Sequence, residues 1–247
     1  MTSTPAESQR DPPPSFANTR WSLVAALNSG DDRARRSLEE LCRSYWYPVY
    51  AYTRRCGHPP QMANDISQAY FGALLQEIQR NDPAAAGRFR DFLLASLNRF
   101  LSADWRARLG EGATLAAPCT VADLETRLAR DHQPEITPEH AFQKSYALEV
   151  LSRSLQRLHV EARQGGRIDM FEALLPYLTT DPAAGQYALL AEGLGTRPLA
   201  LVVAVRRLRQ RYRELVDQEL IETVATPADL ERERRALFAM LSGARKE

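Results

Sequence analysis

Arginines crowd one segment of the chain, and they are the residues best suited to bind a charged ligand. Five of them fall within eight positions with no carboxylate among them: Arg206, Arg207, Arg209, Arg211 and Arg213. On a helix of 3.6 residues per turn they spread over most of the circumference, whereas Leu208 and Tyr212 keep one stripe apolar. Guanidinium groups pair with phosphates, so the pattern favours a helix lying along nucleic acid. A helical hairpin with a solvated basic face fits the same residues equally well.

A turn between two helices precedes this basic run. Ala191 and Gly195 are small enough to let two helices cross closely, and Gly195 tolerates the backbone of a turn. Apolar residues recur around them at the spacing of a helix-turn-helix core: Leu190, Leu194, Leu201 and Ala204. The pattern predicts a helix-turn-helix from Tyr187 to about Leu220, with Arg197 at its turn.

A second set of basic residues is interleaved with aromatic residues between positions 88 and 108. Phe100 and Trp105 lie among five arginines: Arg88, Arg90, Arg99, Arg106 and Arg108. Bases that stack on rings while phosphates pair with arginine are typical of a bound single strand. Because the aromatic residues also recur at core spacing, the polar positions are the better candidates for an exposed face: Asn98, Arg99, Ser102, Arg106 and Arg108.

No residue pattern in the chain supports catalysis or metal binding. The four histidines have no Cys, Asp or Glu at ligand spacing, and no phosphate-binding glycine loop or nucleophile motif occurs. We therefore expect no enzyme activity and no cofactor. The formal net charge is only +1, so any basic surface must be local. Three scattered cysteines and the lack of an 18-residue apolar run predict a cytoplasmic protein with no membrane partner.

Helical periodicity covers most of the chain, so the predicted fold class is all-α. We expect a disordered tail over 1–17, then a helical domain over 18–109 whose second helix is kinked at Pro48. Glycines and prolines over 110–136 predict a flexible linker, with a weak helical signal near 121–130. A second domain with the helix-turn-helix covers 137–222, and a helical extension covers 223–247. The prediction is thus two small helical domains joined by a flexible linker.

Five segments in order make the chain resemble bacterial RNA polymerase sigma factors of the extracytoplasmic-function type, over roughly residues 19 to 240. They are TRWSLVAAL, LEELCRSYWYPVYAYTRRCGH, GRFRDFLLASLNRFLSADW, Tyr187–Arg213 and ETVATPADLERERRALFAML. The resemblance implies a transcription initiation factor whose partners are the polymerase core (clamp and flap) and promoter DNA. It places the melted promoter element on Arg88, Arg90, Asn98, Arg99, Ser102, Arg106 and Arg108. It places the upstream element on Arg197, Leu199, Val202, Val203, Arg206, Arg207, Arg209, Arg211 and Arg213.

Two segments depart from the pattern of that family. The family commonly has an acidic cluster at the start of the third helix, which docks on the polymerase clamp. Here the polymerase-binding positions are Gln61, Met62, Asn64, Asp65 and Gln68, of which only Asp65 is charged. Loss of complementary charge should weaken docking. The recognition helix carries Leu199, Val202 and Val203, which can contact thymine methyls but cannot hydrogen-bond base edges.

Thr53 could supply the missing charge. It lies a few residues before the depleted segment, at a position where family members often have an aliphatic residue. Phosphorylation would add about two negative charges. Some sigma factors that lack the acidic patch are paired with Ser/Thr kinases, so the resemblance adds such a kinase as a partner and Thr53 as its phosphorylation site.

Two alternatives stay open at this point. One is a helix-turn-helix regulator that does not use polymerase, although such a protein has no need of the segment GRFRDFLLASLNRFLSADW. The other is a degenerate sigma-like interaction protein that binds a partner without directing transcription. The apolar recognition helix and the depleted acidic segment keep the latter open, and a transcription initiation factor stays the leading hypothesis.

Overall fold

The computed structural model describes residues 32–78, 88–103, 105, 117–131 and 136–243, and its elements there are helices. They are α2 (Asp32–Arg55), α3 (Pro60–Ile78), α4 (Phe89–Ser102), α5 (Val121–Arg130), α6 (Pro138–Gln164), α7 (Ile168–Leu174), the 3-10 helix η4 (Leu175–Leu178), α8 (Gln186–Gly193), α9 (Pro198–Ile221) and α10 (Pro227–Gly243). Within those ranges the β pairing consists of one isolated bridge between Arg88 and Val224. The predicted all-α class is confirmed. The tail that we expect over 1–17 and the start of the predicted first domain, up to residue 31, lie outside the described residues.

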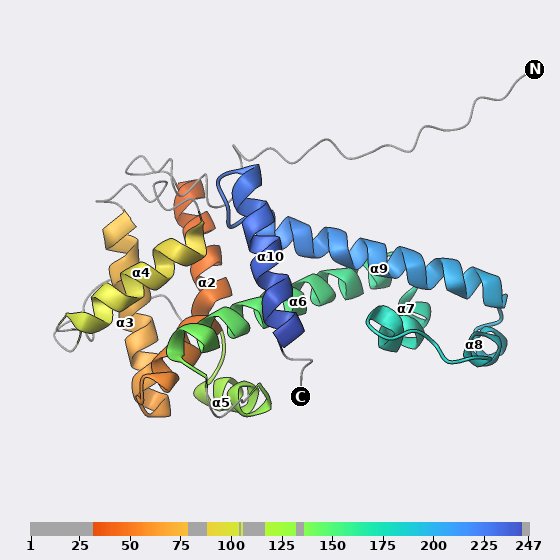
Figure 1. The fold of residues 1–247 in the computed structure, drawn as a ribbon, viewed down its shortest axis with the longest axis horizontal. Helices are drawn as coiled ribbons and strands as arrows, with labels where there is room; N and C mark the ends of the chain where they lie inside the picture. The colour runs from red at the N-terminus through yellow and green to blue at the C-terminus, as the bar shows by residue number, and fades with distance from the viewer. Residues whose placement is uncertain (1–31, 79–87, 104, 106–116, 132–135, 244–247) are drawn as a thin grey trace, which may run out of the picture.

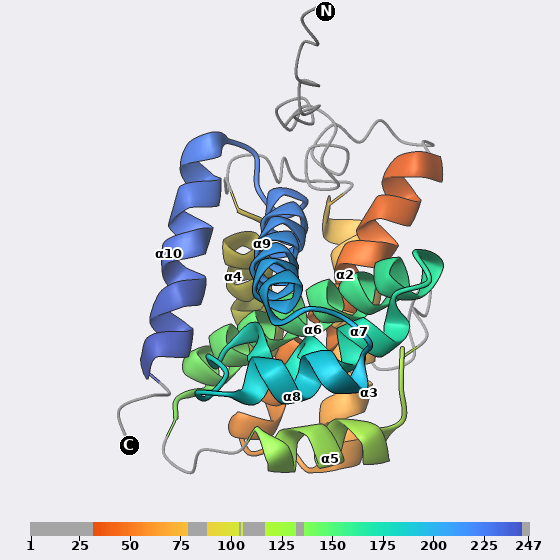
Figure 2. The ribbon, with the colours of Figure 1, turned by 90° about the vertical axis from the view of Figure 1, so that its right-hand side faces the viewer.

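The helices are spread along one long axis (Figure 1). α2, α3 and α4 gather at one end, and α7 and α8 lie at the other. α6 and α9 run side by side between the two ends, and α10 contacts α6 and the end of α9 from which it follows. Viewed along that axis, α5 lies below the other helices, where it contacts α2 and α3 (Figure 2).

α2 lies at the centre of the main core. Every residue from Leu41 to Thr53 except Arg43 is buried, so this half of the helix has neighbours on every side. The helix continues through Pro48 as one element. A single amphipathic stripe accounts for only some of these positions, because the side chains between the stripe residues are buried as well.

Aromatic rings join α2 to helices from both halves of the chain. The ring of Tyr45 stacks on Tyr146 of α6 with 4.9 Å between centroids, and it meets Phe89 of α4 edge-on at 5.1 Å. Trp46 stacks on Phe71 of α3 at 5.2 Å. The same core continues into the end of α9 and into α10 through Leu220, Val224, Leu230 and Leu237.

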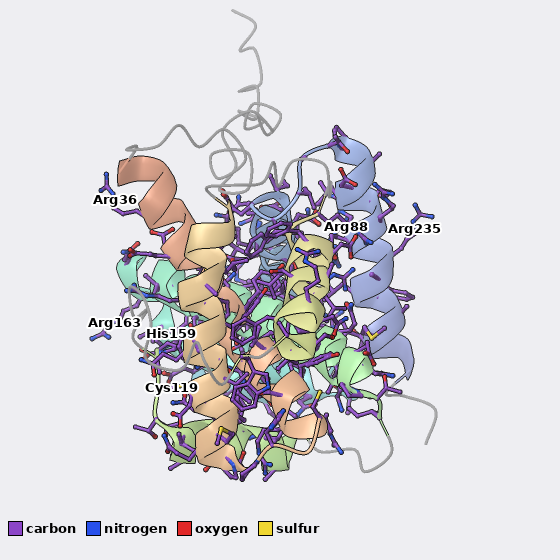
Figure 3. All side chains as sticks on the ribbon, turned by 90° about the vertical axis from the view of Figure 1, so that its left-hand side faces the viewer. Arg36, Arg88, Cys119, His159, Arg163 and Arg235 are labelled. Atoms are coloured by element: carbon purple, nitrogen blue, oxygen red, sulfur yellow. The ribbon has the colours of Figure 1, made fainter. Side chains whose placement is uncertain are left out.

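The two halves predicted as separate domains therefore share one hydrophobic core in this structure. The physical reason is the burial of α2 on all sides: α3 and α4 cover only part of it, and α6 covers much of the rest. In Figure 3 side chains occupy the region between α3 and α4, and the buried residues of this core come from both halves of the chain.

The described part of the predicted linker contains an ordered helix. Thr120 and Asp123 form a capping box at the start of α5, which explains why the weak helical signal there produces a helix. Tyr47 of α2 donates a hydrogen bond to Asp131 at 2.7 Å, and Arg54 pairs with Glu125 at 2.8 Å. The Arg54 guanidinium lowers the pKa of the Glu125 carboxyl through this hydrogen bond. α5 is thus attached to α2 by polar contacts as well as by burial of Leu124.

Two smaller apolar clusters lie at the far end of the molecule. One is formed by η4, α7, α8 and the first half of α9, and includes Leu174, Tyr177, Ala191 and Leu201. The other joins α6 to α7 and the middle of α9 through Leu158, Phe171 and Leu215. These clusters position α8 and the start of α9 away from the main core.

Candidate nucleic-acid interface

α8 and α9 meet at the turn that the small residues predict. The two helices are bent by 97° relative to each other, and residues 194–197 connect them. Gly195 has φ of +60°, a left-handed conformation that glycine adopts without the steric cost of a side chain. Ala191 is 3% exposed at the helix contact, and its carbonyl accepts a hydrogen bond from the Thr196 amide at 2.9 Å. The turn is therefore closed by its own backbone.

The outer face of α9 beyond this turn is exposed and mixes apolar with basic side chains. Leu199 is 75% exposed, and Val202 and Val203 are 43% and 42% exposed. The exposed arginines on or beside this helix are Arg197, Arg206, Arg207 and Arg213. These arginines and the three apolar residues are exposed as a DNA-contacting face requires, and DNA contact itself stays a prediction.

Arg209 contacts other parts of the protein. Its Nε donates to the Tyr177 carbonyl at 2.8 Å, and its Nη2 donates to the Thr180 carbonyl at 2.9 Å. The same Nη2 lies 2.7 Å from the Asp181 carboxylate. Arg209 thus attaches α9 to η4 and to the segment that follows it.

Arg211 is engaged in the same way with α6. Its Nε and Nη2 both lie 2.8 Å from the Glu161 carboxylate, and its Nη1 lies 3.1 Å from Glu214. Hydrogen bonding from Arg211 lowers the pKa of Glu161. Of the five arginines of the run, Arg209 and Arg211 have intramolecular partners that sequence spacing does not reveal, because those partners lie about 30 and 50 positions away.

The second set of predicted DNA-binding residues is found in several different environments. Asn98, Arg99 and Ser102 are exposed on α4. Arg88 pairs with Asp91 through Nε at 2.7 Å, and Figure 3 shows it where α4 begins, beside α10. Arg106 and Arg108 lie outside the described residues.

Arg90 is buried beneath α10, only 5% exposed. Its Nη2 lies 3.1 Å from a carboxylate oxygen of Glu233, its Nη1 donates to Gln143, and its guanidinium lies 5.4 Å from the centroid of the Tyr146 ring. Glu233 is 1% exposed, and burial raises the pKa of its carboxyl while Arg90 opposes that rise. The residue predicted to bind a melted strand instead joins α4 to α6 and α10.

Backbone contacts strengthen this junction. The Phe89 amide donates to the Thr223 carbonyl at 3.0 Å, and the isolated β-bridge joins Arg88 to Val224. Sequence reasoning missed Glu233, because it lies in the charged run ERERR, which is typical of a solvated helix face. A weak signal does exist: Glu233 is three positions after Leu230 and four before Leu237, both of which are buried.

The predicted polymerase-binding positions lie at the start of α3. Gln61 is exposed, whereas Met62, Asn64, Asp65 and Gln68 are half-buried. Gln61 donates a hydrogen bond to Asp65 at 3.0 Å, and the first turn of α3 carries no acidic residue. Gln61 and Asn64 therefore place amide groups at positions where the sigma-factor pattern has carboxylates.

Thr53 is fully buried near the end of α2. Its hydroxyl donates to the Tyr50 carbonyl at 2.8 Å and lies 3.5 Å from the Ala63 carbonyl of α3. A kinase acts on an exposed hydroxyl, so phosphorylation of Thr53 requires α2 and α3 to separate locally.

No group of three His, Cys, Asp or Glu side chains that could bind a metal occurs in the described ranges. No single helix in the part of the chain that the structure describes is long and apolar enough to cross a membrane. The chain matches no family model, no curated protein and no solved structure in the comparisons.

Proposed function

We propose that this protein is a transcription initiation factor of the sigma type, which binds core RNA polymerase and directs it to promoters. The α8–α9 pair carries the proposal. A bend of 97° and a four-residue turn with a left-handed glycine support the proposal, because they fall in the range that helix-turn-helix motifs share. The exposed Arg206 and Arg207 lie on its second helix, positioned to pair with phosphates.

The apolar residues of the recognition helix restrict how it binds DNA. Leu199, Val202 and Val203 offer no hydrogen-bonding group to base edges, so contact with thymine methyls and phosphate anchoring supply the affinity. We therefore expect weak discrimination among upstream sequences, with the exposed α4 residues Asn98 and Arg99 contributing contacts to the melted strand.

The shared core gives the proposed factor a closed resting arrangement. α6 covers α2, and α10 lies over Arg90, so the first three described helices and the α8–α9 pair are tied together. A factor that contacts two promoter elements at once must separate these parts. Polymerase binding would then provide the free energy for opening. Polymerase would bind the open form better than the closed form, because it would contact surfaces that are buried in the closed form.

We also propose that phosphorylation of Thr53 is linked to this opening. The hydroxyl becomes accessible only when the α2–α3 junction opens, so a kinase would act on an opened form. A phosphate there cannot return to the buried position without losing its hydration, so modification would hold the junction open.

The shared core also favours a second candidate, a helix-turn-helix regulator that stays closed and never engages polymerase. Gel filtration of the purified full chain with core RNA polymerase separates the two. A sigma factor elutes with the polymerase, and Asp65→Arg, at the start of α3, weakens that association, whereas the exposed control Glu231→Arg on α10 does not. A chain that binds DNA but elutes apart from polymerase would establish the regulator instead.

A further inference from the structure

A cavity of about 370 Å³ lies between the end of α6, α7 and α9. It is found where the two small apolar clusters of this region meet, and Leu208 packs against both of them. Its volume is in the range of small-molecule sites. At about 30 Å³ for each water-sized group, it has room for on the order of a dozen non-hydrogen atoms.

Apolar side chains from three helices form the interior of this cavity. Leu158, Phe171 and Leu174 line it and are buried, each less than 5% exposed. Val203 of α9 and Met170 of α7 contribute to its walls. Such an interior favours an aliphatic body over a polar one.

Charged groups occur at the edge of the cavity, and their balance is positive. Three arginines, Arg167, Arg207 and Arg211, line it together with one carboxylate, Glu161. Arg211 and Glu161 neutralise each other at 2.8 Å. Arg167 and Arg207 are exposed, and neither side chain has an ion-pair or hydrogen-bond partner within the described ranges. Two guanidinium groups are thus free to bind a ligand beside an apolar interior.

We propose that this cavity binds a small anionic amphiphile, with a carboxylate or phosphate head on Arg167 and Arg207 and an aliphatic body on Leu158, Phe171 and Leu174. Guanidinium groups bind such heads through paired charge-assisted hydrogen bonds. The apolar interior and the arginines together indicate an amphiphile. Phosphate binding alone needs no apolar pocket, and binding of an apolar ligand alone needs no cations.

The site overlaps the proposed DNA-binding face, because Val203 and Arg207 belong to both. A regulatory role for the ligand rests on the proposed function. The ligand would be an effector of DNA binding, because its head would occupy the Arg207 guanidinium that otherwise pairs with a DNA phosphate. Ligand and DNA would then compete for the same arginine.

Calorimetric titration of the full chain with decanoate below its micelle concentration tests the site. We expect saturable binding with one decanoate per chain, and weaker binding of about tenfold for Arg207→Ala, because a charge-assisted hydrogen bond is removed. Val203→Trp, which fills the cavity from its half-exposed wall, should remove binding. Matched controls on the same helix, Arg206→Ala and Val202→Trp, change exposed residues that do not line the cavity and should bind as the wild type does.

Several outcomes would overturn this inference. They are the absence of saturation, equal effects of the cavity variants and their controls, and decanol binding as tightly as decanoate. A second arm measures DNA affinity with and without decanoate. Decanoate binding without any effect on DNA would reject the effector role alone, and a chain that binds decanoate but no polymerase would reject the sigma function alone.

Discussion

Replacement of Glu233 with alanine should destabilise the protein substantially. Glu233 and Arg90 are 1% and 5% exposed, with 3.1 Å between the carboxylate oxygen and the guanidinium nitrogen. Removing one partner of a buried ion pair costs about 3–5 kcal/mol, because the other charge stays buried without compensation. Arg90 keeps its contacts with Gln143 and the Tyr146 ring, so we expect the lower end, about 3 kcal/mol.

Urea unfolding of the full chain at pH 7, followed by circular dichroism, measures this loss. The matched control is Glu231→Ala, because Glu231 is exposed on the same helix and pairs with Arg234 at 3.1 Å. An exposed pair contributes little, so the control should lose under about 1 kcal/mol. Equal losses for Glu233→Ala and the control would refute the reasoning that α10 is attached to α4 through a buried ion pair.

Three further predictions concern the arginines of α9 and the buried threonine. The double variant Arg206→Ala with Arg207→Ala should weaken binding to every DNA sequence. The slope of log affinity against log salt concentration should become shallower by about one for each arginine that no longer pairs with a phosphate. An unchanged slope would place both arginines on a merely solvated face. Arg211 lowers the pKa of Glu161, so the stability from this carboxylate is present above its ordinary pKa of 4.5 and is lost as the pH falls through its lower folded pKa. Glu161→Gln should remove that loss in thermal unfolding between pH 7 and 3, and identical profiles for the two proteins would contradict it. Thr53→Glu should lower the unfolding midpoint far more than Thr53→Ser, because it buries a charge, and equal midpoints would mean that the α2–α3 junction is open in solution.

Local signals in the sequence identify the helices well. The 3.6-residue periodicity and the glycine at the α8–α9 turn correspond to helices and a turn of the structure. The capping pair Thr120 and Asp123 explains why a helix forms within the predicted linker. These signals act between residues a few positions apart, which is the range over which a sequence pattern can be interpreted.

Partnerships across long separations could not be predicted in the same way. The contact of Arg211 with Glu161 joins positions 50 apart, and the contact of Arg90 with Glu233 joins α4 to the last helix. An amphipathic pattern says that a face is buried, but it does not name the helix that covers it. The shared core around α2 depends on that choice of partner, which no local signal in the sequence specifies.

Run-off transcription with purified core polymerase on genomic fragments tests the proposed sigma function most directly. The wild-type chain should produce discrete transcripts that core polymerase alone does not produce, and Arg206→Ala with Arg207→Ala should remove them. Glu233→Ala, which weakens the closed arrangement, should retain them or increase them at a temperature where that variant is folded. The contrary result is the same set of transcripts with and without the protein, when the protein binds DNA and is added at saturating concentration. That result would contradict the proposal that this protein directs polymerase to promoters.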